Sequence, residues 1–378
     1  MHMFAIGMCS TGYVPFLQSL GLSLADIPLI NIFFMGTIFL MEIPTGMLAD
    51  GRSRGWSVKV GIGIWALSTF AYALAQGFWT VLISEALGGL GNAFISGAFV
   101  AWLTDALKNR GEGKKLQKIL VTTSVSQTVC CLAAGFIGSW IWMISPRLGW
   151  CVCGVMMLIT LAVTYRYLDE RGEPLNRISE IQALKLTILG LKNNPWLRWS
   201  GAVCAISGLV FAFNYYWSPF YIECFGRNRI GLIWILIYGT VAVSGLLLRF
   251  RAIRFAGPVN GIVLSLIVTG LGLAFAGYLG CTVWSIAFAM IHEFGRGLFR
   301  PLADTFFQKQ FQSENRATAG SAQSFIQTLA WSLILLVAWY LMRDMPDGSH
   351  SISMAWIVSG VLLVILSTLL WLLRPKKK

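Results

Sequence analysis

Charged residues are scarce in this sequence, and three absences limit what the protein can be. Asp, Glu, Lys and Arg make up 12% of its 378 residues. A soluble domain carries about 25%, so this chain cannot cover a water-facing surface. It has three histidines and no HExxH, paired-aspartate or serine–histidine pattern, which argues against an embedded enzyme. It also lacks the Gly-x-x-x-x-Gly-Lys-Ser/Thr loop that binds nucleotide phosphates, so no intrinsic ATPase is predicted.

The eight cysteines lie in or beside apolar segments and lack the spacing and histidine partners of a zinc site. Buried thiols are therefore expected, and neither a metal nor any other cofactor is predicted. A disulfide between Cys224 and Cys281, which both lie near the predicted outer face, is the less favoured alternative.

Long apolar runs fill most of the chain, of which 56% is hydrophobic. Each run has about the 20 residues that a helix needs to cross roughly 30 Å of hydrocarbon. We therefore predict an all-α polytopic membrane protein whose lipid-embedded chain has twelve transmembrane helices. The predicted spans are 2–20, 27–48, 58–77, 79–105, 119–144, 148–168, 199–222, 230–248, 256–278, 282–303, 318–342 and 353–373.

The formal net charge of +13 could indicate nucleic acid, but the positions of the basic residues favour a membrane topology. Most lysines and arginines fall in loops on one side of the predicted bilayer, which the positive-inside rule assigns to the cytoplasm. Both termini are expected on that side, in the inner membrane of a bacterium, with no nucleic-acid partner. Residues 1–20 lack the basic start of a cleavable signal peptide and continue as a span. A mis-assigned start is an open alternative.

The sequence repeats itself weakly. "GYVPFLQSLG" at 12–21 resembles "YWSPFYIECFG" at 216–226, and Gly46 and Asp105 have counterparts in Gly245 and Asp304, each 199 positions later. Parallel six-helix repeats are a known transporter plan. We predict two pseudo-symmetric six-helix bundles, 1–168 and 199–378, joined by a cytoplasmic linker, 169–198, with an amphipathic helix on the membrane surface.

The stretch "EIPTGMLADGRSR" at 42–54 resembles the signature between the second and third helices of the major facilitator superfamily. Gly46, Asp50 and Arg54 match that signature, while Gly51, Ser53 and Gly55 depart from it. "SGAFVAWLTDAL" at 96–107 and "RGLFRPLADTFF" at 296–307 also resemble members of the superfamily. The resemblance implies secondary transport by alternating access, with a central cavity lined by the first, fourth, seventh and tenth helices.

The fifth predicted span lacks the Gly-Pro motif that drug–proton antiporters of the superfamily carry, and Arg249 stands where the second signature's aspartate would fall. Both departures weaken a role in proton-driven drug export. The signature itself predicts a conformational latch at the cytoplasmic boundary, and a static boundary cluster is the alternative. The latch candidates are Glu42, Gly46, Asp50, Arg54 and Asp105.

The tenth predicted span contains "MIHEFGRGLFRPLAD", which places ionisable residues near mid-membrane. Helical spacing puts Glu293, Arg296 and Arg300 on one face, and His292 four residues before Arg296. Each charge costs about 2.5–3.5 kcal/mol on insertion scales, so these residues should face an internal cavity. We expect them to bind substrate or a coupling ion. A Glu293–Arg296 salt bridge that only locks helices is the alternative.

Glu85, in the fourth span, could carry a proton, bind a cationic group or pair with a distant arginine. Other polar residues within spans are weaker candidates, because each can equally serve helix–helix contact. They are Asn92, Gln127, Asn214, Tyr215, Tyr216, Gln323 and Gln327.

Together these features predict a monomeric secondary transporter of a small organic solute, with proton coupling left open. The basic residues near mid-membrane favour a solute with an anionic group, and export is the preferred direction. The alternatives are import of an organic anion or of a metal chelate such as a siderophore, and a membrane sensor that no longer transports.

Overall fold

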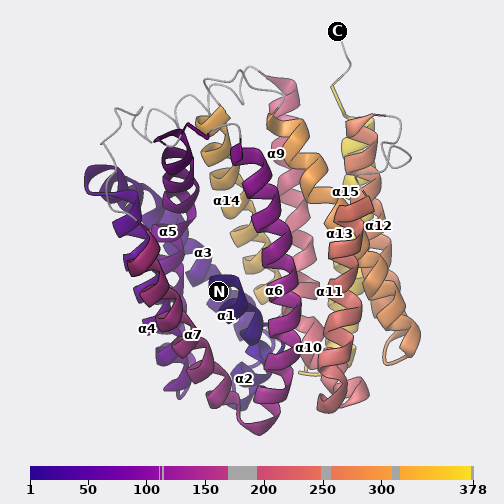
Figure 1. Ribbon diagram of the computed structural model, residues 1–378. Coiled ribbons are helices and arrows are strands. Elements are labelled where there is room, and N and C mark those ends of the chain that lie inside the picture. The colour runs from indigo at the N-terminus through magenta and orange to yellow at the C-terminus, as the bar shows by residue number, and fades with distance from the viewer. Residues whose placement is uncertain (110, 113–114, 169–193, 248–256, 309–315, 376–378) are drawn as a thin grey trace. The chain divides into compact units, whose positions relative to one another are not determined.

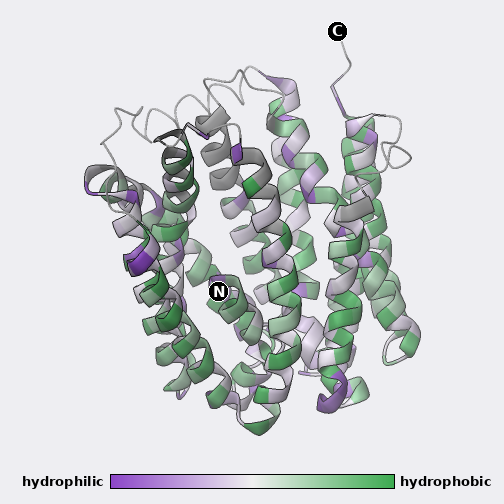
Figure 2. Ribbon diagram, in the orientation of Figure 1, coloured by the Kyte–Doolittle hydropathy of each residue, from purple (hydrophilic) through white to green (hydrophobic). Residues whose placement is uncertain are grey.

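The computed structural model describes residues 1–109, 111–112, 115–168, 194–247, 257–308 and 316–375. In this part of the chain the regular structure is helical and no strand occurs (Figure 1). Seven of the described helical stretches are long and apolar enough to cross a membrane. Hydrophobic residues run along the helices, and hydrophilic ones gather toward the ends (Figure 2). The prediction of an all-α membrane protein is confirmed, and the helix order is consistent with twelve spans.

The chain divides into two compact units, 1–177 and 178–378. The division falls within the predicted linker, of which residues 169–193 lie outside the described part. The second unit's first described helix begins at Pro195, a few residues before the predicted span. Its start is set by Asn194, whose side chain accepts hydrogen bonds from the backbone amides of Trp196 and Leu197.

Unit 1 contains seven described α-helices, because its first predicted span is divided in two. Their bounds are α1 His2–Cys9, α2 Tyr13–Ser19, α3 Asp26–Gly51, α4 Arg54–Ala73, α5 Phe78–Asn109, α6 Leu116–Ile144 and α7 Pro146–Tyr167.

Unit 2 follows the same order, again with an interrupted first span. Its described elements are α9 Pro195–Ile206, the 3₁₀ turn η2 Ser207–Val210, α10 Phe211–Phe225, η3 Arg227–Arg229, α11 Ile230–Leu247, α12 Pro258–Leu279, α13 Val283–Gln308, α14 Arg316–Met342 and α15 Ser349–Leu372.

The two units pack their helices in corresponding pairs. If each interrupted first span is counted as one, the fourth span lies against the second and third in each unit. These contacts are α5 against α3 and α4, and α13 against α11 and α12. The third also packs on the sixth, as α4 on α7 and α12 on α15. The interrupted first helix contacts the fifth and sixth in both units. This matched packing agrees with the repeat predicted from the sequence.

In unit 1, a tryptophan on α6, the fifth span, packs over the break between α1 and α2. The amide of Gly12 donates to the carbonyl of Cys9, 3.2 Å away. The indole N–H of Trp142, on α6, donates to the carbonyl of Met8 at 2.8 Å. A Cβ atom on Gly12 would overlap the ring of Trp142. The break therefore depends on a glycine and on the indole packed against it.

Unit 2 has the same arrangement at its own break. The indole N–H of Trp331, on α14, donates to the carbonyl of Cys204 at 3.2 Å. Gly208 lies against that indole, and a Cβ atom there would overlap it. In each unit the glycine follows the bonded carbonyl by four residues, so the two halves interrupt their first helix by the same device.

A disulfide joins Cys224, near the end of α10, to Cys281, just before α13. The expectation that these thiols are free is therefore wrong for this pair. The cause is tertiary, since α10 and the α12–α13 connection meet at one end of unit 2. At that end Ser349 donates a hydrogen bond to Glu223, Oγ to Oε1, at 2.7 Å. The other six cysteines are free thiols.

Candidate functional site

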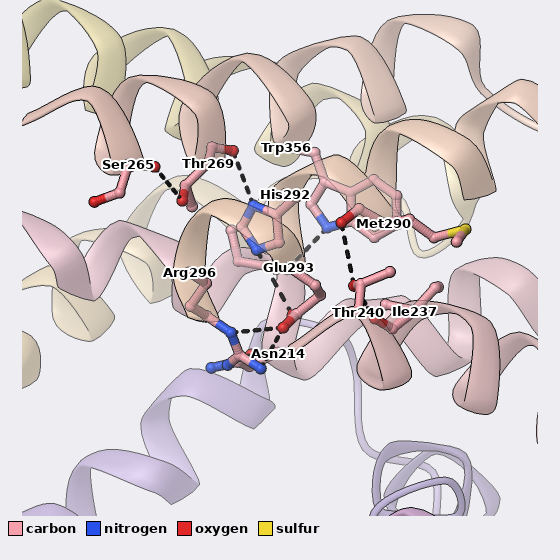
Figure 3. A network of polar contacts seen from close by, with 11 residues as sticks. Asn214, Ile237, Thr240, Ser265, Thr269, Met290, His292, Glu293, Arg296 and Trp356 are labelled. Carbon is pink, nitrogen blue, oxygen red and sulfur yellow. Dashed lines mark hydrogen bonds and ion pairs between the residues drawn. The ribbon is translucent and has the colours of Figure 1, made fainter. Parts of the chain in front are cut away.

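Three ionisable residues of α13, His292, Glu293 and Arg296, form a network in the interior of unit 2 (Figure 3). Glu293 is fully buried; its Oε2 accepts a hydrogen bond from Arg296 Nε at 2.7 Å and forms an ion pair with Nη2 at 2.5 Å. A carboxylate that receives two guanidinium N–H groups is held firmly in both position and charge. The predicted Glu293–Arg296 pair is therefore present.

Two further side chains, from α10 and α11, position the guanidinium of Arg296. Its Nη1 donates to Asn214 Oδ1 at 2.9 Å. Its Cζ lies 5.4 Å from the centroid of the Tyr238 ring, within the range of a cation–π contact. The side chain of Arg296 nevertheless remains 27% exposed. The cation is thus fixed on several sides while part of its surface stays accessible.

His292 extends the network to α12. Its Nδ1 lies 3.0 Å from the carbonyl oxygen of Thr269, whose hydroxyl donates to Ser265 O at 2.7 Å. Because a carbonyl can only accept, Nδ1 carries the proton and Nε2 of the neutral ring is an acceptor. Nε2 lies 3.9 Å from Glu293 Oε1, and neither atom has a hydrogen-bond partner among the described residues.

Arg300 does not join this network. Its side chain is 80% exposed, and its Nε lies 3.9 Å from Asp304 Oδ2. Seven residues along a helix correspond to about 10 Å of rise, which takes the side chain beyond Glu293 although both lie on similar faces. The structure therefore separates Arg300 from the cluster in which the sequence pattern placed it.

Glu85, on α5, is the centre of a second buried network, in unit 1. Its Oε1 accepts hydrogen bonds from the hydroxyls of Tyr13, at 2.5 Å, and Tyr72. Asn31 Nδ2 in turn donates to the Tyr13 hydroxyl at 3.0 Å. The ring of Trp150 stacks on that of Tyr72, with 4.0 Å between centroids. Within the described residues Glu85 forms no ion pair, so the pairing with a distant arginine is not observed.

The remaining polar candidates are dispersed. Asn92 on α5, Tyr215 on α10 and Gln327 on α14 are partly buried, and Gln127 on α6 is exposed. Tyr216 is buried beside Trp217 in α10. Gln323 lies in α14, but its side chain falls outside the described part. Among the described residues, Asn92, Gln127 and Gln327 make no hydrogen bond to either ionisable network.

The latch candidates lie at the junction of α3 and α4 and near the end of α5. Glu42 and Gly46 are partly buried on α3, and Arg54 is buried at the first position of α4. The hydroxyl of Ser53 caps α4 by accepting from the amide of Trp56 at 3.0 Å. The side chains of Asp50 and Asp105 lie outside the described part, so their contacts remain a prediction.

Several partners in the two networks were not predicted as site residues. Tyr13, Asn31 and Tyr72 around Glu85, and Tyr238 and Thr269 in unit 2, come from helices distant in sequence. Their only sequence signal is a polar group within an apolar span, which marks helix contacts as often as functional sites.

The family model of the Major Facilitator Superfamily matches residues 1–335. The chain belongs to this superfamily. The resemblance predicted from the sequence is thereby confirmed. It supports a general function as a transporter. No curated protein matches the sequence.

Solved structures of the same superfamily fold superpose on nearly the whole chain. The nucleoside transporter NupG gives a TM-score of 0.75 at 16% identity, over 100% of this chain and 97% of that one. A bacterial homolog of the human lysosomal transporter Spinster gives 0.75 at 15% identity, over 98% and 93%. An auto-inhibited POT family peptide transporter gives 0.74 at 12% identity, over 100% and 95%. At these identities the likeness establishes the fold alone.

Proposed function

We propose that this superfamily member is a secondary active transporter of a small organic solute that carries an anionic group. The observation that carries the proposal is Arg296, a positioned and partly exposed guanidinium on α13, the helix that corresponds to the tenth predicted span. Ionisable residues at such depth are costly and mark substrate or ion pathways. A fixed planar guanidinium suits a carboxylate or phosphate group because it donates two parallel N–H bonds.

The pairing with Glu293 supplies a way to bind and release the solute. In the absence of solute, Glu293 neutralises Arg296 through one oxygen, which accepts a hydrogen bond from Nε and pairs with Nη2. An incoming anionic group competes for the same N–H groups, and the carboxylate returns when the solute leaves. Asn214, which holds the third nitrogen, keeps the guanidinium in place during the exchange.

The transporter acts in the inner membrane of a bacterium as a monomer with both termini cytoplasmic, and its preferred direction is export. Import of an organic anion or of a metal chelate such as a siderophore is the second candidate, favoured by the same guanidinium. Alternating access would proceed by movement of the two units, with Asp50 and Arg54 serving as a latch. A sensor that binds its solute without transport is the remaining alternative.

The experiment is a thermal-shift screen of the purified protein in lipid nanodiscs against organic anions and iron chelates. A true ligand at one hundred times its Kd stabilises the native state by about 2.7 kcal/mol. The double variant Glu293→Gln/Arg296→Gln, which removes both charges and nearly preserves volume, should fold and lose that response. Flux in proteoliposomes with the same compound then separates a transporter from a sensor.

The proposal fails if the double variant, once reconstituted, binds and transports the compound as the wild type does. The Glu293–Arg296 pair would then be a structural salt bridge. The direction of transport is decided by measuring flux into and out of proteoliposomes of known protein orientation, with and without a pH gradient.

A further inference from the structure

Glu85 and Glu293, the buried carboxyl groups among the described residues, differ in what compensates their charge. Glu293 is bound to the guanidinium of Arg296. Glu85, buried to 7% exposure, is bound only by phenolic hydroxyls among the described residues. A proton on Glu293 would leave Arg296 without its anion, whereas a proton on Glu85 removes a charge that no cation in the described part of the chain balances. Glu85 is therefore the carboxyl group better suited to gain and lose a proton.

The donors around Glu85 show what a proton would change. Tyr13 and Tyr72 both donate to the same oxygen, Oε1, and Asn31 donates to Tyr13. Both phenols thus donate to the carboxyl group, and Asn31, which also donates to Ile27 O, supports one of them; this arrangement favours a carboxylate acceptor. Hydrogen bonds to an ionised acceptor are about twice as strong as those to a neutral one. Protonation would weaken the hold of Glu85 on both tyrosines.

The position of Tyr13 connects this change to the backbone. Tyr13 is the first residue of α2, directly after the break that follows Cys9. Tyr72 lies near the end of α4, and Asn31 lies on α3. The carboxyl group therefore ties the short helix α2 to three neighbouring helices. Loss of its charge would release α2 at the point where the first span is already interrupted.

We propose that Glu85 binds the coupling proton of the transport cycle and that its protonation state sets the position of α2 within unit 1. This inference rests on the proposed transport function but concerns a separate site, in the other unit from Arg296. In this scheme Glu85, which accepts hydrogen bonds from two tyrosines, binds the proton, and Arg296 binds the solute.

Among the described groups that surround Glu85, none is another carboxyl or a histidine, so Glu85 is the residue expected to titrate. The other titratable side chains in its network are the phenols Tyr13 on α2 and Tyr72 on α4. The helix α3 contributes the neutral amide of Asn31, and α7 the ring of Trp150. Trp142, on α6, packs edge-on against Trp150. Arg147, on α7, donates to the carbonyls of Ala73 and Ala75 at 3.5 and 3.3 Å.

The first test uses the proton itself as the probe and needs no solute. A protonated carboxyl group has an infrared C=O band that a carboxylate lacks, and pH-difference spectra of the full chain in nanodiscs record its titration. We expect a titrating band that is lost in Glu85→Gln and kept in Glu293→Gln. The glutamine keeps an oxygen that can accept from both tyrosines, so the variant should fold. If the band that is assigned to Glu85 still titrates in Glu85→Gln, the assignment is overturned.

The second test asks whether the proton moves α2. Spin labels at Ser19 and Gln76, both exposed, report the distance between the end of α2 and the α4–α5 connection. The wild type should show two distance populations whose ratio changes with pH. Glu85→Gln should hold one population at every pH, and Tyr13→Phe should uncouple the populations from pH while keeping the infrared band. A pH-independent distance in the wild type, or an unchanged shift in Glu85→Gln, contradicts the inference. Neither readout depends on the anion site.

Discussion

At the scale of single residues, Glu293 and Arg296 depend on one another. Arg296→Ala leaves a fully buried carboxyl group without its cation. Removing one partner of a buried pair costs about 3 kcal/mol or more. We expect this variant to express poorly and to unfold at a lower temperature. Glu293→Gln/Arg296→Gln, which leaves no unpaired charge, should recover most of the expression.

Arg300→Ala is the matched control for that measurement, because Arg300 is exposed and makes only a 3.9 Å contact, Nε to Oδ2, with the exposed side chain of Asp304. Its thermal unfolding in detergent should match the wild type within about 0.5 kcal/mol. Equal losses for Arg296→Ala and Arg300→Ala would show that burial of Glu293 is not the cause.

The sequence predicted which residues form the pair, but not its surroundings. Glu293 and Arg296 lie one helical turn apart on one helix, so their contact follows from spacing alone. Asn214, Tyr238 and Thr269 come from three other helices, and one sequence carries no measure of which helices meet. Helical spacing also grouped Arg300 with the pair, because it shows which residues share a helix face but not how far apart they lie along the helix axis.

At the scale of helices, the break between α1 and α2 should be sensitive to a single methyl group. Gly12→Ala places a Cβ atom where the ring of Trp142 lies. Either the indole moves and loses its bond to Met8 O, or the break shifts. Overpacking of this kind costs about 1–3 kcal/mol. A lowered unfolding temperature in nanodiscs is the expected result.

Gly36→Ala, on α3, is the control for Gly12→Ala. A Cβ atom at Gly36 meets no other atom within 4 Å. Alanine also favours the helix over glycine by up to about 1 kcal/mol. The control should therefore be neutral or stabilising, and a loss equal to that of Gly12→Ala would point to a general intolerance of alanine.

The helix breaks themselves could not be predicted, although the spans could. Apolar runs of suitable length identify the spans, since each must cover the hydrocarbon thickness. Between Cys9 and Tyr13 stands no proline, and the break arises from a glycine packed on an indole of another helix. Pro15, by contrast, lies inside α2 without ending it. A break of tertiary origin leaves no local signal.

At the scale of the whole molecule, the proposed latch should control the balance between inward-open and outward-open states. We expect Asp50→Asn to shift this balance while the protein stays folded, because it removes the charge that the signature places beside Arg54. Spin-label distances measured across the ends of the two units would report the change. Unchanged distance distributions with wild-type transport would leave Asp50 as a static boundary residue.

Orientation in the membrane is a second property of the whole chain. We expect the loops near Lys114 and Lys185 to be cytoplasmic and the loop near Asp347 to be external. Single cysteines at these positions, in a chain whose six free thiols are replaced, can be labelled with an impermeant maleimide. Labelling at position 114 in intact cells would falsify this topology.

The bond between Cys224 and Cys281 makes the wild-type chain a reporter of its own biogenesis. Disulfides form in oxidising compartments and seldom in the bacterial cytosol. We expect this end of unit 2 to be external, so the bond should form only after Cys224 and Cys281 have been exported and have met the periplasmic oxidation machinery. Host strains without that machinery should accumulate a chain with two extra reactive thiols. A chain inserted the other way round would give the same pattern in every host, so a gel-shift comparison of two strains reads the orientation without any introduced cysteine.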